Sequence, residues 1–272
     1  MGNVAYITHD NGHLTGYDGW DSTTTSGSGA IAASTAALMA GTTYGAAVTV
    51  AAASDTAYGT VDISAAASST DVRLRLYFDP NSVTIPTTKD FVFASLIDSA
   101  SAEYAYIAVK NNAGTFQINA LVYDDGKGTN ESVGWTNITD APHVVELHLQ
   151  KAATNVSSDG EIHLWVDGAV IGTSQTDVDL FDNWDWDTLD IGAVSGVDAS
   201  TSGTFYFDQV CINDDDHTIG PWRNPFGVNR AVRDYLVDID HSDGTLDAWT
   251  ETTSGSGALA ASAAAAMAGT DY

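Results

Sequence analysis

The sequence predicts an all-β protein built as an antiparallel sandwich, and three observations support this class. Stretches that alternate apolar with polar residues, or form short runs of β-branched and aromatic residues, recur along the chain. Turn clusters rich in Asp, Asn, Gly and Ser separate them, which is typical of short connected strands and not of βαβ units. The apolar fraction of 44%, with 10% aromatic residues, is enough for a sizeable core. The expected strands span 61–64, 72–78, 91–97, 104–110, 115–123, 143–150, 161–168, 188–194 and 204–212.

The alternation also assigns the two faces of several strands, because successive side chains of a strand point to opposite sides. In the stretch 72–78, Arg73, Arg75 and Tyr77 share the face opposite to the apolar residues. In the stretch 161–168, His163 and Trp165 are expected to point outward. A Trp on the outer face of a sheet is a candidate ligand contact, so Trp165 is a predicted carbohydrate-binding residue.

The Ala-rich stretch 30–41 reads as a helix by propensity alone. Ser and Thr flank it, Gly41 ends it, and a strand pattern follows at once. We therefore expect a strand near its start and a single helical turn from Thr35.

The charge is strongly acidic, with 9 Lys and Arg against 36 Asp and Glu and a formal net charge of −27. Such a surface repels phosphate groups and anionic lipids, so no nucleic-acid partner is expected. No apolar run approaches the ~20 residues that a membrane span needs, so no membrane insertion is expected either. The remaining interpretations are a hydrated surface that resists aggregation, adaptation to a saline medium, or binding of divalent cations.

The single cysteine, Cys211, lies in an apolar strand pattern and is expected to be a buried residue without a disulfide. The N-terminus has no basic segment followed by an apolar segment, so no signal peptide is visible. An extracellular or virion location is the expectation.

Residues 20–44 are repeated at 249–272, with Trp20 matching Trp249 and Tyr44 matching Tyr272. The period of about 228 residues is the length of a domain, far above that of solenoid repeats. We expect a domain at 1–218, a linker with a short helix at 219–244, and a partial repeat of residues 17–44 at 245–272. That last segment either completes a sheet by strand addition or begins a further domain. Its predicted assembly residues are Trp249, Leu259, Met267 and Tyr272.

Three segments then carry a family resemblance: 18–50, 160–172 with the hairpin pattern EIHLWVDGAVIG, and 203–214 with TFYFDQVCIND. Together they resemble a laminin-G-like jelly roll of the concanavalin A-like lectin/glucanase superfamily, over roughly residues 17–214. The resemblance implies a jelly-roll β-sandwich and is weak for any one function, because the superfamily includes sugar-binding modules, adhesins, glucanases and virion proteins. The paired Glu residues of its glucanase branch, in an E-x-D-x-x-E pattern, are absent, so no enzyme is expected.

Two clusters are candidate binding sites. Trp184 and Trp186, with Asp185 and Asp187, would form a sugar-stacking platform if they face solvent. Alternatively, the two Trp side chains cover the core, or they form a subunit contact.

Asp208 in the last strand, with Asp10 or Asp18 near the first, would supply oxygen ligands for a structural Ca²⁺. Solvated or capping carboxylates are the alternative. No other cofactor is expected.

These observations favour a non-enzymatic structural or binding protein, most simply a phage decoration, fibre or filament subunit that self-associates or contacts other virion or surface proteins. The alternative is a carbohydrate-binding adhesin module of a microbial surface protein.

Overall fold

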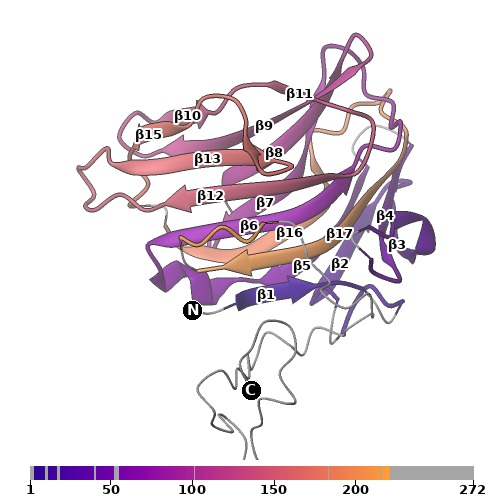
Figure 1. Ribbon diagram of the computed structural model, residues 1–272, viewed down its shortest axis with the longest axis horizontal. Helices are drawn as coiled ribbons and strands as arrows, with labels where there is room; N and C mark the ends of the chain where they lie inside the picture. The colour runs from indigo at the N-terminus through magenta and orange to yellow at the C-terminus, as the bar shows by residue number, and fades with distance from the viewer. Residues whose placement is uncertain are drawn as a thin grey trace, which may run out of the picture. The chain divides into compact units, whose positions relative to one another are not determined.

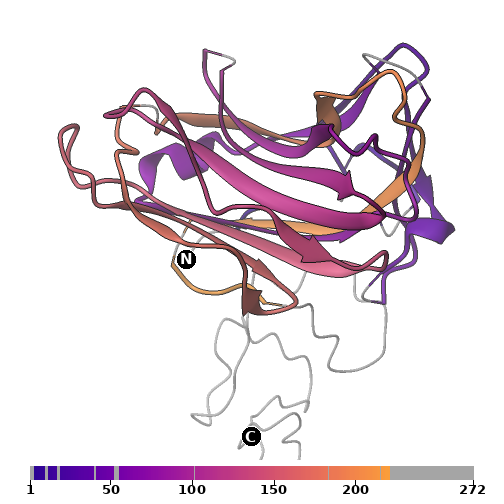
Figure 2. The same ribbon diagram turned by 90° about the horizontal axis from the view of Figure 1, so that it is seen from above.

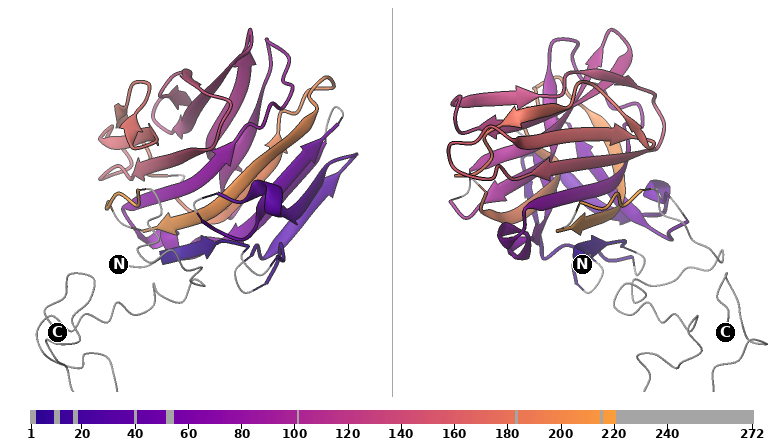
Figure 3. Two further views of the ribbon diagram at one scale, coloured as in Figure 1. Left: turned by 45° about the vertical axis from the view of Figure 1, so that its right-hand side comes forward. Right: turned by 60° about the vertical axis from the view of Figure 1, so that its left-hand side comes forward.

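The computed structural model describes residues 3–9, 12–16, 19–39, 41–51, 55–100, 102–182, 184–214 and 216–220. In this part of the chain, two antiparallel sheets pack face to face (Figure 1). This is the antiparallel β-sandwich that the strand pattern predicts, and it is the jelly roll that the family resemblance implies. Turned views show the same two layers (Figures 2 and 3).

The first sheet has nine strands and contains both the first and the last strand of the sandwich. Its main path runs β14-β13-β12-β6-β17-β4-β3, with β1 paired to β17 and β15 paired to β13. The strands are β1 (Asn3–Ile7), β3 (Ala30–Ser34), β4 (Gly45–Val50), β6 (Asp71–Asp79), β12 (His143–Gln150), β13 (Gly160–Val166), β14 (Ala169–Val170), β15 (Gln175–Val178) and β17 (Gly203–Asn213).

The second sheet has eight strands in the order β10-β9-β8-β7-β16-β5-β2, with β11 paired to β9. The strands are β2 (Ser22–Ser26), β5 (Thr56–Asp62), β7 (Asp90–Asp98), β8 (Glu103–Asn112), β9 (Thr115–Asp124), β10 (Thr129–Ser132), β11 (Thr136–Ile138) and β16 (Trp186–Ser195). Two 3-10 turns, η1 (Thr35–Ala37) and η2 (Ser64–Ser68), join strands. The Ala-rich stretch therefore forms a strand followed by one short turn, as expected.

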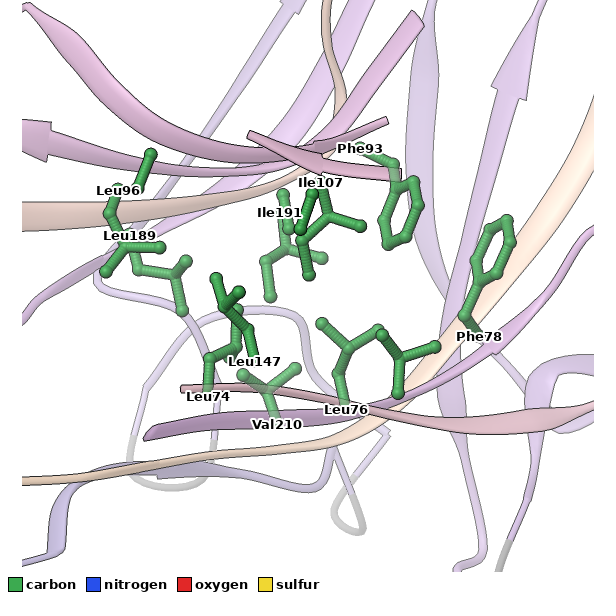
Figure 4. Packing of buried hydrophobic residues seen from close by; sticks show 14 of the residues in the cluster. Leu74, Leu76, Phe78, Phe93, Leu96, Ile107, Leu147, Leu189, Ile191 and Val210 are labelled. Carbon is green, nitrogen blue, oxygen red and sulfur yellow. The ribbon is translucent and has the colours of Figure 1, made fainter. Parts of the chain in front are cut away.

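The core lies between the sheets and is built from alternate residues of the strands. Leu74 and Leu76 of β6 face Leu189 and Ile191 of β16 across it (Figure 4). Phe78 of β6 stacks on Phe93 of β7 with ring centroids 4.4 Å apart, so this pair packs one sheet against the other. Phe205 and Phe207 of β17 pack around the same pair.

Several predictions fall on residues outside the described ones. They are the linker beyond Gly220, the partial repeat at 245–272, and the assembly residues Trp249, Leu259, Met267 and Tyr272. The predicted domain boundaries therefore stay predictions. No helix in the described ranges has the length and apolar character of a membrane span.

The aromatic pair between the sheets gives a test of the core. Phe78→Ala removes a fully buried ring that contacts three other phenylalanines. We expect the free energy of unfolding to fall by about 3–5 kcal/mol, from lost burial and the cavity left behind. Guanidinium denaturation measures it. Val156→Ala, at a site that is 85% exposed, is the control and should change stability by less than about 0.5 kcal/mol.

A second test concerns His9, which is fully buried 5.5 Å from the Trp20 ring. Neither ring nitrogen has a hydrogen-bond partner among the described residues, and burial lowers the pKa of His9 to about 4. The unfolded chain takes up a proton near pH 6.5, which the folded chain does not. Acidification from pH 6.5 to 4 should therefore destabilise the fold, with a slope of up to about 1.4 kcal/mol per pH unit from this group.

Denaturant titrations at pH 7, 5.5 and 4 check this slope. His9→Asn is the informative variant, because His9 has φ = +57° and Asn tolerates that region. The variant should lose less stability than the wild type over the interval. Replacing the exposed His13 by Asn is the control. Equal slopes in the wild type and His9→Asn would contradict the assignment.

Candidate functional site

The outer face of the eight-stranded sheet carries four half-buried tyrosines, Tyr58, Tyr104, Tyr106 and Tyr123. We call this surface the tyrosine face. The residues between them, such as Ile107 and Val122, belong to the core, so the alternation of β5, β8 and β9 places the tyrosines outward.

Strand register aligns one continuous row across this face. Asp190 of β16 lies opposite Thr60 and Ser95, and Ser95 lies opposite Tyr106. Tyr106 lies opposite Leu121, which pairs with Ser132 of β10. The row crosses six strands, so it extends about 24 Å at the usual strand spacing.

The tyrosines are fixed by neighbours on the same face. Tyr104 and Tyr123 meet edge to face with centroids 5.7 Å apart. The amide of Asn130 donates a hydrogen bond to the Tyr106 hydroxyl at 3.3 Å. Burial raises the pKa of Tyr106, with help from the charge of Glu103, so its hydroxyl stays protonated and able to donate. Half-buried aromatic rings beside fixed polar groups are the combination that sugar rings and hydroxyls require.

Two carboxyl groups lie on the tyrosine face, one on each side of Ser95. The Ser95 hydroxyl donates to Glu103 at 2.9 Å, and the Thr60 hydroxyl donates to Asp190 at 2.6 Å. Burial raises the pKa of both carboxyl groups, and the charge of Asp190 raises the pKa of Glu103 further. These carboxyl groups make the face acidic at neutral pH. Glu103 is exposed and can accept a hydrogen bond from a ligand hydroxyl, whereas Asp190 is only 5% exposed.

A cation–π contact lies at the end of the face where β11 pairs with β9. The Lys110 ammonium sits 4.1 Å from the centroid of the half-buried Trp135 ring. The Gln117 amide donates to Asn137 at 2.6 Å. The aromatic and amide character of the face therefore continues toward this end of the sheet.

The outer face of the nine-stranded sheet is also polar, but two of its charged side chains, Arg73 and Glu146, bond groups of the protein itself. Arg73 pairs with Glu146 at 3.1 Å, and both side chains are nearly inaccessible. The backbone N–H groups of Ile219 and Gly220 donate to the Glu146 carboxylate at 3.0 and 2.9 Å, and the Arg73 Nε donates to the Asp216 carbonyl. Residues 216–220 therefore cover the part of this face around Arg73 and Glu146, which makes that part less suited to a ligand than the tyrosine face.

The predicted sugar platform is not present. Trp184 and Trp186 are only 5% and 1% exposed and belong to the core. Their rings meet edge to face 5.2 Å apart, and the Trp184 indole donates to the Ser69 carbonyl at 2.8 Å. The two rings do share one face, as their spacing indicates, but it is the inward face. Asp185 and Asp187 are exposed, and the Asp185 carboxylate accepts the Ser99 hydroxyl.

Trp165 does point away from the core, as the alternation predicts, and it is half-buried. Its ring stacks on His163 at 5.5 Å, and the Arg73 guanidinium lies 5.1 Å from its centroid. These contacts occupy the ring. Trp165 points away from the core to which Trp184 and Trp186 belong, so the three tryptophans do not form one site.

Of the three predicted calcium ligands, only Asp208 lies within the described residues. It is fully buried and accepts hydrogen bonds from Met39 N, the Thr42 hydroxyl and Gln209 N, which fasten the segment after η1 to β17. No cluster of three or more metal-ligating side chains occurs among the described residues. The calcium site stays a prediction, since Asp10 and Asp18 fall outside those residues.

The tyrosine face was missed from the sequence, although its signal was present. The stretches 104–110 and 115–123 are recognisable strands whose outward positions hold Tyr104, Tyr106, Asn119 and Tyr123. The sequence does not show that β16 inserts between β5 and β7 and adds Asp190 to the row.

Comparison with known proteins gives matches in solved structures only. No protein-family model matches the chain, and no curated protein matches its sequence. The endo-β-1,4-glucuronan lyase of the fungus Trichoderma reesei is 15% identical, covers 78% of this chain and 95% of its own, and has a TM-score of 0.54. The binding domain of botulinum neurotoxin serotype D is 10% identical, covers 79% of this chain and 48% of its own, and has a TM-score of 0.51. These likenesses show the jelly-roll sandwich, in keeping with a concanavalin A-like fold.

The prediction that the protein is not an enzyme is contradicted, because a polysaccharide lyase has this fold. The sequence argument rested on a missing E-x-D-x-x-E pattern within one strand. It failed because a sheet also collects carboxyl groups from separate strands, as it does here for Glu103 of β8 and Asp190 of β16.

The raised pKa of Asp190 predicts a stability effect. Because the folded protein disfavours its ionised form, Asp190→Asn should raise the free energy of unfolding at pH 7, by about 0.5–1 kcal/mol. The difference should shrink as the pH falls through the folded pKa and vanish below the unfolded pKa near 3.9. Denaturant titrations of both proteins at pH 7, 5 and 3.5 measure it.

The control for this prediction removes the same charge from an exposed position, in Asp187→Asn. A gain of equal size in both variants would mean that relief of the net charge, and not burial of Asp190, is responsible.

Proposed function

We propose that this protein binds a neutral polysaccharide along the tyrosine face. The observation that carries the proposal is the row from Thr60 to Ser132, in which Asp190, Ser95 and Tyr106 lie side by side across the sheet. An extended glycan laid along this row would stack on the half-buried Tyr106 ring, with the other tyrosines of the face beside it. Its hydroxyls would bond accessible polar groups such as Thr60, Glu103 and Ser132.

The charge of the face argues for a neutral chain over an acidic one. Glu103 and Asp190 lie on the face, and the whole protein carries a formal charge of −27. A polyanionic chain would be repelled by the two carboxylates on the face and by the negative net charge of the whole protein. This separates the proposed ligand from glucuronan, the acidic polymer on which the lyase with the same fold acts.

The proposal agrees with a carbohydrate-binding module of a surface protein. Within the superfamily, the laminin-G-like resemblance of the sequence is the subgroup that we propose. The fold supports a glycan-binding role without naming the glycan, since unrelated functions share it. A virion role and self-association through the C-terminal repeat remain separate hypotheses.

The experiment is calorimetric titration of the full chain with neutral β-glucan, xylan and arabinan oligosaccharides and with a polyglucuronate. We expect binding to at least one neutral chain and weaker or no binding to the polyglucuronate. Tyr106→Ala should weaken affinity about 30-fold, which corresponds to ~2 kcal/mol for a central aromatic contact.

Tyr206→Ala is the matched control, because Tyr206 is a half-buried tyrosine on β17 of the other sheet. It should leave the affinity unchanged. Preferential binding of the polyglucuronate, or equal losses in both variants, would refute the tyrosine face as a site for neutral glycans.

A second candidate is cleavage of the bound glycan, and the carboxyl pair around Ser95 favours it. Glycoside hydrolysis uses one carboxyl group as acid and another as base or nucleophile, and raised pKa values suit the acid. Glu103 and Asp190 both have raised pKa values, and the charge of Asp190 contributes to the raised pKa of Glu103. Release of reducing ends from the bound oligosaccharide, lost in both Glu103→Gln and Asp190→Asn, would establish this activity. Binding without any release of reducing ends would exclude it for that glycan.

A further inference from the structure

Three side chains on the outer side of β13 form a hydrogen-bonded chain that the glycan site does not use. The Ser174 hydroxyl lies 2.8 Å from His163 Nδ1, and the Glu161 carboxylate lies 2.6 Å from His163 Nε2. The pairing of β15 with β13, which sets Gln175 opposite Ile162, brings Ser174 beside His163. Glu161 and His163 are two apart on one strand and share its outer face.

The hydrogen bonds fix where the protons lie. An ionised carboxylate only accepts hydrogen bonds, so Nε2 of a neutral His163 carries the proton that Glu161 accepts. Nδ1 then has a free lone pair and accepts the Ser174 O–H. This is the order of roles in serine hydrolases, nucleophile to base to orienting carboxylate, with the two ring nitrogens exchanged.

The imidazole is held in place yet reachable. His163 stacks between His148, at 5.7 Å with rings 21° apart, and Trp165, at 5.5 Å with rings 25° apart. The side chain of His163 is 20% exposed and that of Glu161 is 32% exposed, and Ser174 is half-buried. His163 is thus held in a fixed orientation beside Ser174, and the pair is open to solvent. A substrate can therefore reach the Ser174 hydroxyl while the base is in position.

The geometry points to an esterase site at Ser174, His163 and Glu161, acting on carboxylic esters. Ser174 Oγ attacks the ester carbonyl carbon while His163 Nδ1 takes the hydroxyl proton. The carbon–oxygen bond to the alcohol then breaks, and the alcohol leaves with the proton from His163. Water then attacks the carbonyl carbon of the acyl group on Ser174 Oγ while His163 Nδ1 takes its proton. The bond from that carbon to Oγ breaks, Oγ receives the proton from His163, and the carboxylic acid leaves. No oxidant, metal or cofactor is consumed.

A neighbouring histidine shows what distinguishes this cluster. His143 also lies between a hydroxyl, Thr139 at 2.9 Å, and a carboxylate, Asp167 at 2.7 Å. However, His143 Nε2 also meets the Thr139 backbone carbonyl at 3.2 Å, and Asp167 also accepts Val144 N. Because of those backbone bonds, the His143 cluster stabilises the start of β12. It serves as an internal control for the Ser174 cluster.

The test is covalent labelling of the full chain with an alkyl fluorophosphonate, followed by mass spectrometry of its peptides. This probe reports bond formation at an activated serine and needs no turnover. We expect label at Ser174, none in Ser174→Ala, and labelling at least ~100-fold slower in His163→Gln, the usual range for loss of a general base. Glu161→Gln is a second variant that keeps the shape of the site if His163→Gln folds poorly.

Controls separate this site from general reactivity. Two variants should label at the wild-type rate. They are Ser157→Ala, at a serine whose hydroxyl bonds the Thr154 hydroxyl, and His143→Gln. Hydrolysis of p-nitrophenyl acetate should fall to background in Ser174→Ala. Absence of label at Ser174, equal labelling of wild type and His163→Gln, or labelling without hydrolysis would overturn the proposal. None of these outcomes bears on glycan binding, since Tyr106 lies on the other sheet.

Discussion

Apolar contact between the inward faces of the two sheets is the constraint on which the rest of the structure depends. Phe78 of β6 stacks on Phe93 of β7 across the core, and Leu76 and Ile191 pack beside them. A shift of one residue in the pairing register of any strand would turn its whole apolar set toward solvent. The apolar contact therefore decides which face of each strand points inward. Every outward side chain, including those of both candidate sites, takes its place from that register.

The two outer faces then differ because different segments lie over them. On the nine-stranded sheet, residues 216–220 bind Glu146 and Arg73, and the segment after η1 binds Asp208. Those contacts satisfy buried charges, as burial demands. On the eight-stranded sheet the polar residues bond each other in pairs, such as Ser95 with Glu103, and keep tyrosine rings half-exposed beside them. Around Arg73, Glu146 and Asp208 the outer face of the nine-stranded sheet is therefore used by the fold itself, while the β13 edge of that sheet and the tyrosine rings of the other sheet stay accessible.

The three tryptophans expected to bind sugar are each held by neighbours that a strand pattern does not reveal. Trp184 and Trp186 were placed on one face correctly, but spacing alone does not say whether that face meets solvent or core. Burial of both indoles in the core decided against a platform. Trp165 was placed outward correctly, yet Arg73 from β6 and His163 from β13 cover its ring. The Trp184 indole bonds the Ser69 carbonyl and Arg73 lies over the Trp165 ring, and both partners are distant in sequence from the tryptophan that they contact.

The all-β class, most strands and the inward or outward direction of residues such as Arg73 and Trp165 follow from local pattern, because strand alternation is a local property of the chain. Which outward residues meet depends on how the strands are ordered in the folded sheets. The insertion of β16 beside β7 brings Asp190 to Ser95, and the pairing of β15 with β13 brings Ser174 to His163. Such meetings depend on the order of strands in a sheet, which is set by packing of the whole core and is not written in any single segment.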